Sequence, residues 1–225
     1  MPVQAVLFGS IGTLVETSEI QRRAFNLAFA AHGLDWEWDQ TLYARMLQSS
    51  GGAARIAAHA QEVGADVDAD MLHATKVSLF IKALGMKGLS PRDGVVEVMS
   101  AATSAGIPVG LASSTGSAQS AAVIDATGGA ISAQDFAFIG DSGMVESGKP
   151  APDIYHAALD ALGVAAADVI AIEDSPTSAA AALAAGVTTF ATPGALHAGH
   201  AFPDGAIMIE ALTPDILGGR MEAAQ

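Results

Sequence analysis

Three places in the sequence carry side chains that can handle a phosphate group. Ser113 follows a short apolar run and offers a hydroxyl donor, and Lys149 offers a positive charge to phosphate oxygens. Glu173 and Asp174 close another apolar run and are hard-oxygen ligands of the kind that Mg²⁺ prefers. Each signal is weak by itself, because a hydroxyl after a strand is most often an ordinary helix N-cap. Together they form the hypothesis of a phosphate site.

Short apolar runs bounded by turn residues predict the strands that would position these groups. The runs are Val3–Phe8, Pro108–Ala112, Phe136–Ile139, Val169–Ile172 and Thr188–Ala191. Helical patterns separate them at residues 116–126, 152–162 and 177–185. This alternation indicates an α/β fold: a Rossmann-like, doubly wound parallel sheet with helices on both faces. The candidate residues would then meet at the carboxyl ends of the strands, where such sheets bind ligands.

The region from residue 18 to residue 87 interrupts this rhythm. Its apolar residues recur at helical spacing, and no segment has the pattern of a strand. Glycines divide it into about four helices, at Gly33, Gly51, Gly52 and Gly64. We therefore expect residues 18–87 to form an α-helical cap, inserted into a core that comprises residues 1–17 and 88–225.

Composition excludes several classes of partner. The formal net charge is −14 and the pI is about 4.5, which argues against nucleic acid or an anionic membrane as a partner. The chain has no cysteine, so disulfides, thiolate catalysis and thiolate metal sites are excluded. No apolar run approaches the ~20 residues of a spanning helix, and no signal peptide is evident. We expect a cytoplasmic protein.

The order and spacing of these motifs are more specific than any one of them alone. The loop at residues 9–14, Ser113, Lys149 and Asp174 follow one another at intervals that resemble the haloacid dehalogenase superfamily, in its subfamily with a helical cap after the first motif. The segments 14–26, 33–36, 50–56 and 149–155 resemble the CbbY type within it. This resemblance implies a Mg²⁺-dependent phosphatase of pentulose bisphosphates, with the β-phosphoglucomutases as cousins.

The resemblance also implies roles for individual residues. It implies a phosphate site of two side chains and two backbone amides: Ser113, Lys149, Gly12 and Thr13. Asp174 would be the Mg²⁺ ligand, with Glu173 supporting it. Arg55 would contact the distal phosphate of the substrate from the cap.

Four positions that would face the substrate depart from the family pattern. Gly9 stands in place of the nucleophilic aspartate and Ile11 in place of the acid/base aspartate, so the usual chemistry has neither a nucleophile nor a proton carrier. Gln21 replaces a cap histidine, and Ala53 replaces a substrate-binding lysine. We expect Mg²⁺ affinity to be greatly weakened. Ser10 does not compensate, because strand alternation predicts that its side chain points away.

The leading interpretation is a non-catalytic protein that binds a small phosphorylated metabolite or a protein partner. One alternative is an active phosphatase or phosphomutase with displaced catalytic groups. Another is an interaction module with a vestigial cavity. His197 and His200 have a spacing that metal ligands can have, but the Gly, Ala and Pro around them predict a mobile surface loop. Trp36 and Trp38 are interpreted as packing residues of the cap.

Overall fold

The computed structural model describes residues 2–48, 51–86 and 88–218. In this part of the chain six parallel strands form one sheet in the order β3-β2-β1-β4-β5-β6. The strands are β1 (Ala5–Phe8), β2 (Val109–Leu111), β3 (Phe138–Ile139), β4 (Val169–Glu173), β5 (Thr188–Ala191) and β6 (Ile207–Met208). This arrangement confirms the predicted α/β class and the parallel sheet.

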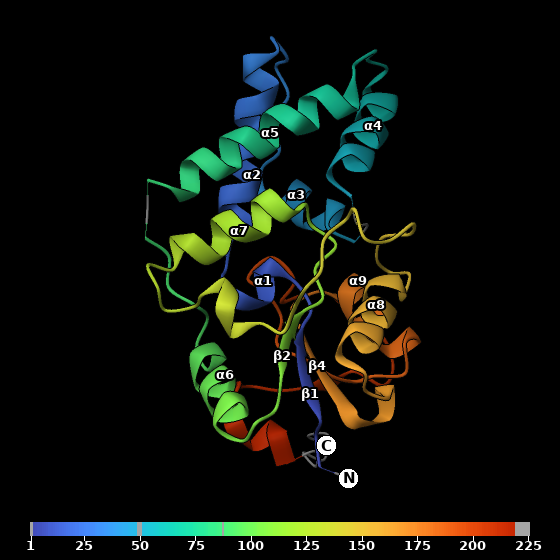
Figure 1. Cartoon of the computed structure of the whole chain (residues 1–225). Helices are drawn as coiled ribbons and strands as arrows, with labels where there is room; N and C mark the ends of the chain where they lie inside the picture. The colour runs from blue at the N-terminus through green and yellow to red at the C-terminus, as the bar shows by residue number, and fades with distance from the viewer. Residues whose placement is uncertain (1, 49–50, 87, 219–225) are drawn as a thin grey trace.

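Alternation along the central strands explains the two layers of helices. Val6 and Phe8 of β1 face one apolar cluster, and Ala5 and Leu7 face another. The first cluster includes residues of α6 (Val95–Ser104) and α7 (Ser117–Ala126), and the second includes residues of α8 (Asp153–Leu162) and α9 (Pro176–Ala184). Figure 1 shows these two pairs of helices on opposite sides of the strands. The sheet is therefore doubly wound, as predicted.

Four helices lie above the carboxyl ends of the strands (Figure 1). They are α2 (Ser18–Ala31), α3 (Gln40–Met46), α4 (Gly52–Val63) and α5 (Ala69–Leu84). Gly64 ends α4 with a φ of 69°, and Gly33 follows α2 with a φ of 74°, which a residue with a Cβ rarely adopts. These helices enclose an apolar cluster of their own, in which Trp38 is fully buried and Trp36 packs against it. The division of the chain into core and cap at residues 17/18 and 87/88 stays our proposal.

Three elements differ from the sequence-based expectation. A helical turn, α1 (Ile11–Leu14), occupies the predicted loop after β1. The side chain of Ser10 caps this turn, accepting a hydrogen bond from the amide of Thr13 at 3.1 Å. Helix α6 and strand β6 were not predicted; β6 has only two residues, too few to show a period.

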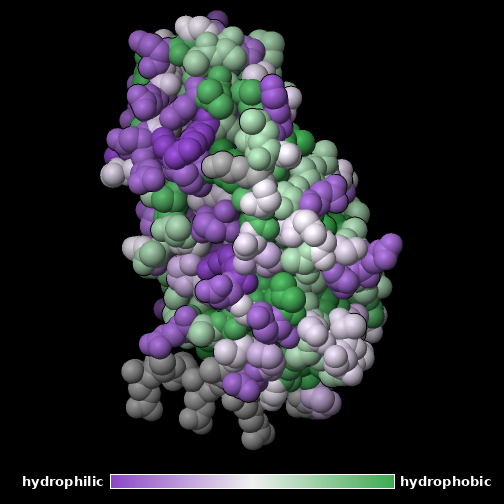
Figure 2. Space-filling view, turned by 90° about the vertical axis from the view of Figure 1, so that its left-hand side faces the viewer, coloured by the Kyte–Doolittle hydropathy of each residue, from purple (hydrophilic) through white to green (hydrophobic). Residues whose placement is uncertain are grey.

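The surface and the helices agree with the composition. On the face shown in Figure 2, apolar side chains are scattered among polar ones. Within the described ranges, no helix combines the length and the apolar character needed to cross a membrane.

Candidate functional site

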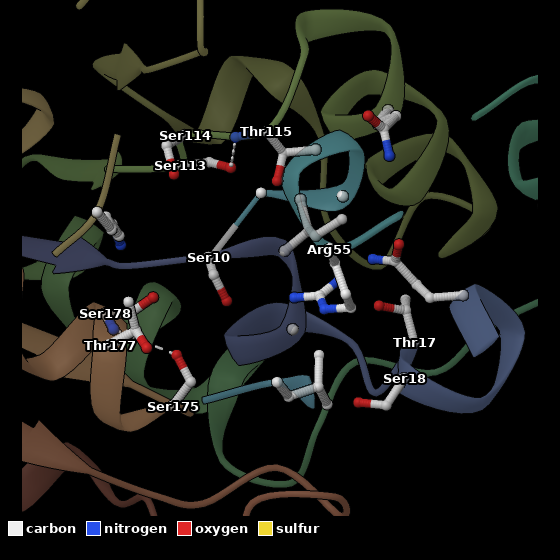
Figure 3. Close-up of a pocket in the computed structure, with 18 of the residues that line it drawn as sticks. Ser10, Thr17, Ser18, Arg55, Ser113, Ser114, Thr115, Ser175, Thr177 and Ser178 are labelled. Atoms are coloured by element: carbon white, nitrogen blue, oxygen red, sulfur yellow. Dashed lines mark hydrogen bonds between the residues drawn. The ribbon is translucent and has the colours of Figure 1, made fainter. Parts of the chain in front are cut away.

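A cavity of about 600 Å³ opens between the sheet and the helices above it. Its floor lies at the ends of β1 and β4, the neighbouring strands at which the strand order reverses and where open α/β sheets bind ligands. Hydroxyl groups are abundant in its wall: Ser10, Thr17, Ser18, Ser113, Ser114, Thr115, Ser142, Ser175, Thr177 and Ser178. In Figure 3 several of these surround a common space into which Arg55 reaches from the helical side. The wall suits a polar, hydroxyl-rich ligand.

The predicted phosphate binders meet in this cavity with one exception. Gly12, Ser113 and Lys149 line it. Ser113 is buried, and its hydroxyl already accepts a hydrogen bond from the amide of Thr115 at 3.1 Å. Thr13 does not line the cavity, because its amide is turned toward Ser10. The arrangement thus supports a smaller cradle than the sequence predicted.

The space beside Gly9 is filled by a side chain from the neighbouring strand. A Cβ added to Gly9 would lie 1.9 Å from Oε1 of Glu173, far inside contact distance. Glu173 is fully buried and is absent from the cavity wall, which differs from its predicted support of a metal in the site. Lys149 donates to its Oε1 at 3.0 Å, and the hydroxyl of Tyr155 donates to the same oxygen. Lys149 also donates to the carbonyl oxygen of Gly9.

Burial shifts the pKa values of Glu173 and Tyr155. Removal from water raises the pKa of Glu173, and the adjacent Lys149 opposes that rise. Burial also raises the pKa of Tyr155 well above its usual range, so this phenol stays a hydrogen-bond donor. Its hydroxyl and Lys149 therefore hold the Glu173 carboxyl in the space that a nucleophile at position 9 would need.

Ser10 points toward the site, so the prediction that its side chain points away was wrong. Its hydroxyl donates to Oδ1 of Asp174 at 2.6 Å, and the hydroxyl of Thr13 donates to the same oxygen at 3.0 Å. The reason is local: β1 ends at Phe8, and Ser10 serves as a helix cap, so strand alternation no longer applies to it. Gly12 packs close by, since a Cβ there would lie 2.5 Å from Oδ2 of Asp174.

The residues at this edge do not fit a Mg²⁺ ion. Mg²⁺ demands near-octahedral oxygen ligands. Among the described residues of the cavity wall Asp174 is the one carboxylate, and its Oδ1 already accepts two hydroxyls. The carbonyl oxygen of Gly9 accepts a hydrogen bond from Lys149, and Ile11 contributes an apolar side chain to the same part of the wall. Among the described residues, no three His, Cys, Asp or Glu side chains are placed to hold a metal.

Arg55 brings a positive charge into the cavity from α4, as predicted for the cap contact. Its Nε donates to the carbonyl oxygen of Met46 at 3.1 Å, and its guanidinium lies 5.7 Å from the centre of the Tyr43 ring. Burial raises the pKa of Tyr43 to about 12, so this side chain remains a neutral phenol. These contacts hold the guanidinium of Arg55 in the wall of the cavity.

Lys76 on α5 also lines the cavity, and the sequence analysis missed it. The side chain is 2% exposed and donates a hydrogen bond to Oε1 of Gln21. Burial, followed by the charge of Arg55, lowers its pKa to about 7. A signal was present in the sequence: residue 76 lies one helical turn from both Leu72 and Phe80, on an apolar stripe.

Basic side chains outnumber acidic ones in the described wall of the cavity. It contains Arg55, Lys76 and Lys149 but one carboxylate, Asp174, while the whole chain has a formal charge of −14. Lys149 is paired with the buried Glu173, and burial lowers the pKa of Lys76, so Arg55 is the basic group of this wall that keeps its charge at neutral pH without an ion pair to Glu173.

The loop that follows β5 lines the cavity and is hydrogen-bonded to the two chain segments that connect the sheet with the four helices above it. Glu16, in the first connection, accepts from the amide of Ala195 at 2.7 Å and from that of Ser18 at 2.8 Å. Arg92, in the second, donates to the carbonyl oxygens of Thr192 and Pro193, both at 3.0 Å. Both connecting segments therefore hold this loop in place.

His197 lies in this loop, and its place corrects the prediction of a surface loop. It is 6% exposed and lines the cavity. Burial lowers its pKa, and its Nδ1 lies 3.2 Å from Nδ1 of His200, a hydrogen-bond distance. Leu196, next to it, packs against the apolar cluster of the helices.

Comparisons with known proteins agree with this geometry. A model of the haloacid dehalogenase-like hydrolases matches residues 3–186. The chain is 39% identical to Protein CbbY, plasmid, of Cupriavidus necator over 215 residues, 92% of this chain and 84% of that protein. The crystal structure of a CbbY variant from Rhodobacter sphaeroides in complex with xylulose 1,5-bisphosphate is 32% identical, with a TM-score of 0.87 over 93% of this chain and 94% of the other.

The chain therefore belongs to the haloacid dehalogenase-like hydrolase family. Within it, the chain is similar to the CbbY proteins, which confirms the resemblance read from the sequence. A β-phosphoglucomutase from Clostridium difficile superimposes with a TM-score of 0.75 at 16% identity, over 95% of this chain and 93% of that one. That likeness shows a shared fold alone.

Proposed function

We propose that this protein binds a small phosphorylated sugar and does not hydrolyse it through an aspartyl-phosphate. One observation carries the proposal: the buried carboxylate of Glu173 occupies the space of a side chain at position 9, while the cavity beyond it stays open. A nucleophile at position 9 is therefore missing and also sterically displaced. Ile11 supplies no proton carrier at the second position.

The ligand class follows from the wall of the cavity. Ser113 and Lys149 on the sheet side suit one phosphate group, and Arg55 on the helical side suits a second anionic group. The hydroxyls between them match the hydroxyls of a sugar. The solved CbbY relative in complex with xylulose 1,5-bisphosphate supports a pentulose bisphosphate as the first compound to try.

Thermal unfolding of the full chain tests this proposal. Xylulose 1,5-bisphosphate, ribose 5-phosphate and inorganic phosphate are each added with and without Mg²⁺, and phosphate release is measured in parallel. We expect a midpoint shift by a sugar phosphate that does not need Mg²⁺, because a ligand that binds the folded state stabilises it. Phosphate release that requires Mg²⁺ would refute the proposal. No shift by any compound would favour a protein partner instead.

A second function has a specific observation in its favour. The hydroxyl of Ser10 donates to Asp174 at 2.6 Å inside the cavity, an arrangement of nucleophile and base. Ser10 Oγ would attack phosphorus while Asp174 takes its proton and returns it to the departing alkoxide; water would then cleave the phosphoserine. Mg²⁺-independent phosphate release that disappears in Ser10→Ala would establish this reaction.

A further inference from the structure

The surroundings of Lys76 are unusual for a lysine. Its nitrogen lies 4.7 Å from the ring centre of Phe25 and 5.1 Å from that of Phe80. The partner of its hydrogen bond is the neutral amide of Gln21. Over the described ranges, no carboxylate forms an ion pair with Lys76, whereas Lys149 has such a partner. The two rings attract the ammonium weakly, but burial without a carboxylate partner favours the uncharged amine, because the charged form loses its hydration.

The titratable groups that face Lys76 reinforce this state. Arg55, on α4, places a second positive charge nearby, and the pKa of Lys76 is about 7. His73, on the same helix, has its own pKa lowered by burial, by Lys76 and by Arg55. Tyr43, on α3, stays neutral because burial raises its pKa to about 12. A large fraction of Lys76 side chains therefore presents a free lone pair near neutral pH.

We propose that Lys76 captures the carbonyl carbon of the bound sugar phosphate as an imine, an inference that rests on the proposed function. The ligand class is an open-chain phosphorylated aldose or ketose. The nitrogen attacks the carbonyl carbon and a C–N bond forms, while a proton moves from nitrogen to the carbonyl oxygen. Loss of water from this carbinolamine gives the imine, and no oxidant or reductant is consumed.

The layout of the cavity gives both ends of such a ligand a partner. Ser113 and Lys149 lie on the sheet side and would hold the phosphate. Lys76 belongs to α5, on the helical side of the same cavity of about 600 Å³, a volume suited to a small metabolite. A phosphate bound on the sheet side would hold the carbonyl in the same cavity as the amine, which raises the effective concentration of the two groups.

Reductive trapping tests the proposal. The full chain is incubated with glyceraldehyde 3-phosphate or ribose 5-phosphate and sodium cyanoborohydride, which turns an imine into a stable amine. Peptide mass mapping then locates the label. The chain has few lysines, so assignment is direct: Lys76, Lys82, Lys87 and Lys149. At neutral pH we expect about tenfold more label on Lys76 than on Lys82, an exposed residue of the same helix.

Two controls separate capture from chance modification. Glyceraldehyde, which has the carbonyl but no phosphate, should lose the preference for Lys76. Labelling by the phosphorylated probe should rise with pH through about 7, because the amine must be free to attack. Equal labelling by both probes would overturn the proposal.

Gln21→Glu is the sharpest variant, because it keeps the shape of the side chain and places a carboxylate against Lys76. The carboxylate would retain the proton on the amine, so labelling at neutral pH should fall about tenfold. Lys76→Met removes the amine, and Lys82→Met serves as its matched control. A Gln21→Glu protein that folds and is labelled like the wild type would contradict the mechanism.

Glycerol 3-phosphate distinguishes failure of this inference from failure of the proposed function. It has the phosphate but no carbonyl, so a midpoint shift reports on binding alone. If glycerol 3-phosphate binds and Lys76 is not labelled, imine formation is refuted while sugar-phosphate binding stands. If it does not bind and no label appears, both proposals are wrong.

Discussion

The two sides of the cavity handle charge in opposite ways. On the sheet side, Lys149 is paired with Glu173, and Asp174 accepts two hydroxyls. On the helical side, Lys76 and Arg55 contact aromatic rings, an amide and a backbone carbonyl. On the first side the lysine is paired with one carboxylate and the other carboxylate accepts hydroxyls, while on the second no carboxylate forms an ion pair with Lys76 over the described ranges.

This difference identifies what each side contributes. On the sheet side, Lys149 and Tyr155 donate to the buried carboxylate of Glu173, which lies against Gly9. The helical side carries the guanidinium of Arg55 and the amine of Lys76, whose pKa burial lowers to about 7. The loss of hydrolysis that we propose concerns the sheet side alone, whereas the binding of a sugar phosphate that we propose uses residues of both sides.

The largest effect should come from disturbing the sheet side at Gly9. Gly9→Asp forces a carboxylate into the space of Glu173, so we expect unfolding to be easier by about 3 kcal/mol or more, without phosphatase activity. Urea unfolding measures the loss. Gly148→Ala is the matched control, because that exposed glycine has open space around it and should change stability by less than about 0.5 kcal/mol. A stable, active Gly9→Asp protein would overturn the displaced-nucleophile interpretation.

Adding Glu173→Ala to Gly9→Asp sharpens the same comparison. The second change empties the contested space, so the double variant should be more stable than the sum of the two single effects predicts. Strict additivity of the measured free energies would mean that Glu173 and position 9 do not compete.

The next effect concerns the helical side and pH. Lys76 has a pKa of about 7 when folded and 10.5 as a free side chain. Between these values the unfolded chain holds a proton that the folded chain lacks, so stability contributed by this group rises with pH. Relative to Lys76→Met, the wild type should gain up to about 1.4 kcal/mol per pH unit above pH ~7. Parallel pH profiles of the two proteins would show that Lys76 is an ordinary lysine.

A smaller effect is expected from Arg55 and should appear in binding alone. Arg55→Met removes a charge from the cavity, so the affinity for a sugar bisphosphate should fall about tenfold. Isothermal titration measures it. Arg45→Met, on the exposed surface of α3 and outside the cavity wall, is the control and should bind normally. If inorganic phosphate loses as much affinity as the bisphosphate, Arg55 does not contact a second anionic group.

The smallest effect is expected for Ser10→Ala. The change removes the cap of α1 and one hydroxyl from Asp174, so stability should fall by about 1 kcal/mol. Thermal unfolding measures this, with Ser104→Ala at an exposed helix end as the comparison. Phosphate release, if any is detected, should not change; its disappearance would instead support the serine reaction.

The sequence predicted the framework because apolar periodicity is a local property. The five predicted strands are present, with boundaries shifted by no more than about two residues, a usual error for short strands. The region of α2 to α5 is helical, and Gly33 and Gly64 lie where helices end. Burial on both faces of β4 was legible from its unbroken apolar run.

The directions of the side chains in the site were harder to predict from the sequence. The inward turn of Ser10 depends on a helix start that a glycine-bearing loop did not reveal. The burial of Glu173 depends on a partner 18 residues away, Tyr155, and on a glycine in another strand. The burial of Lys76 was not predicted, because a lysine in a helix usually keeps its charged end in water. Its position on the apolar stripe of α5 was the one local signal against that expectation.

The contacts of the loop after β5 bear on how long a ligand stays bound rather than on how tightly it binds. Glu16 and Arg92 bind this loop from the two connecting segments between sheet and helices, and Leu196 packs against the helical cluster. Helices and sheet cannot separate without disturbing these contacts together. If the proposed ligand leaves only when sheet and helices separate, its residence time depends on breaking these contacts. We therefore expect occupancy to follow an average of metabolite concentration over that interval, smoothing out brief fluctuations.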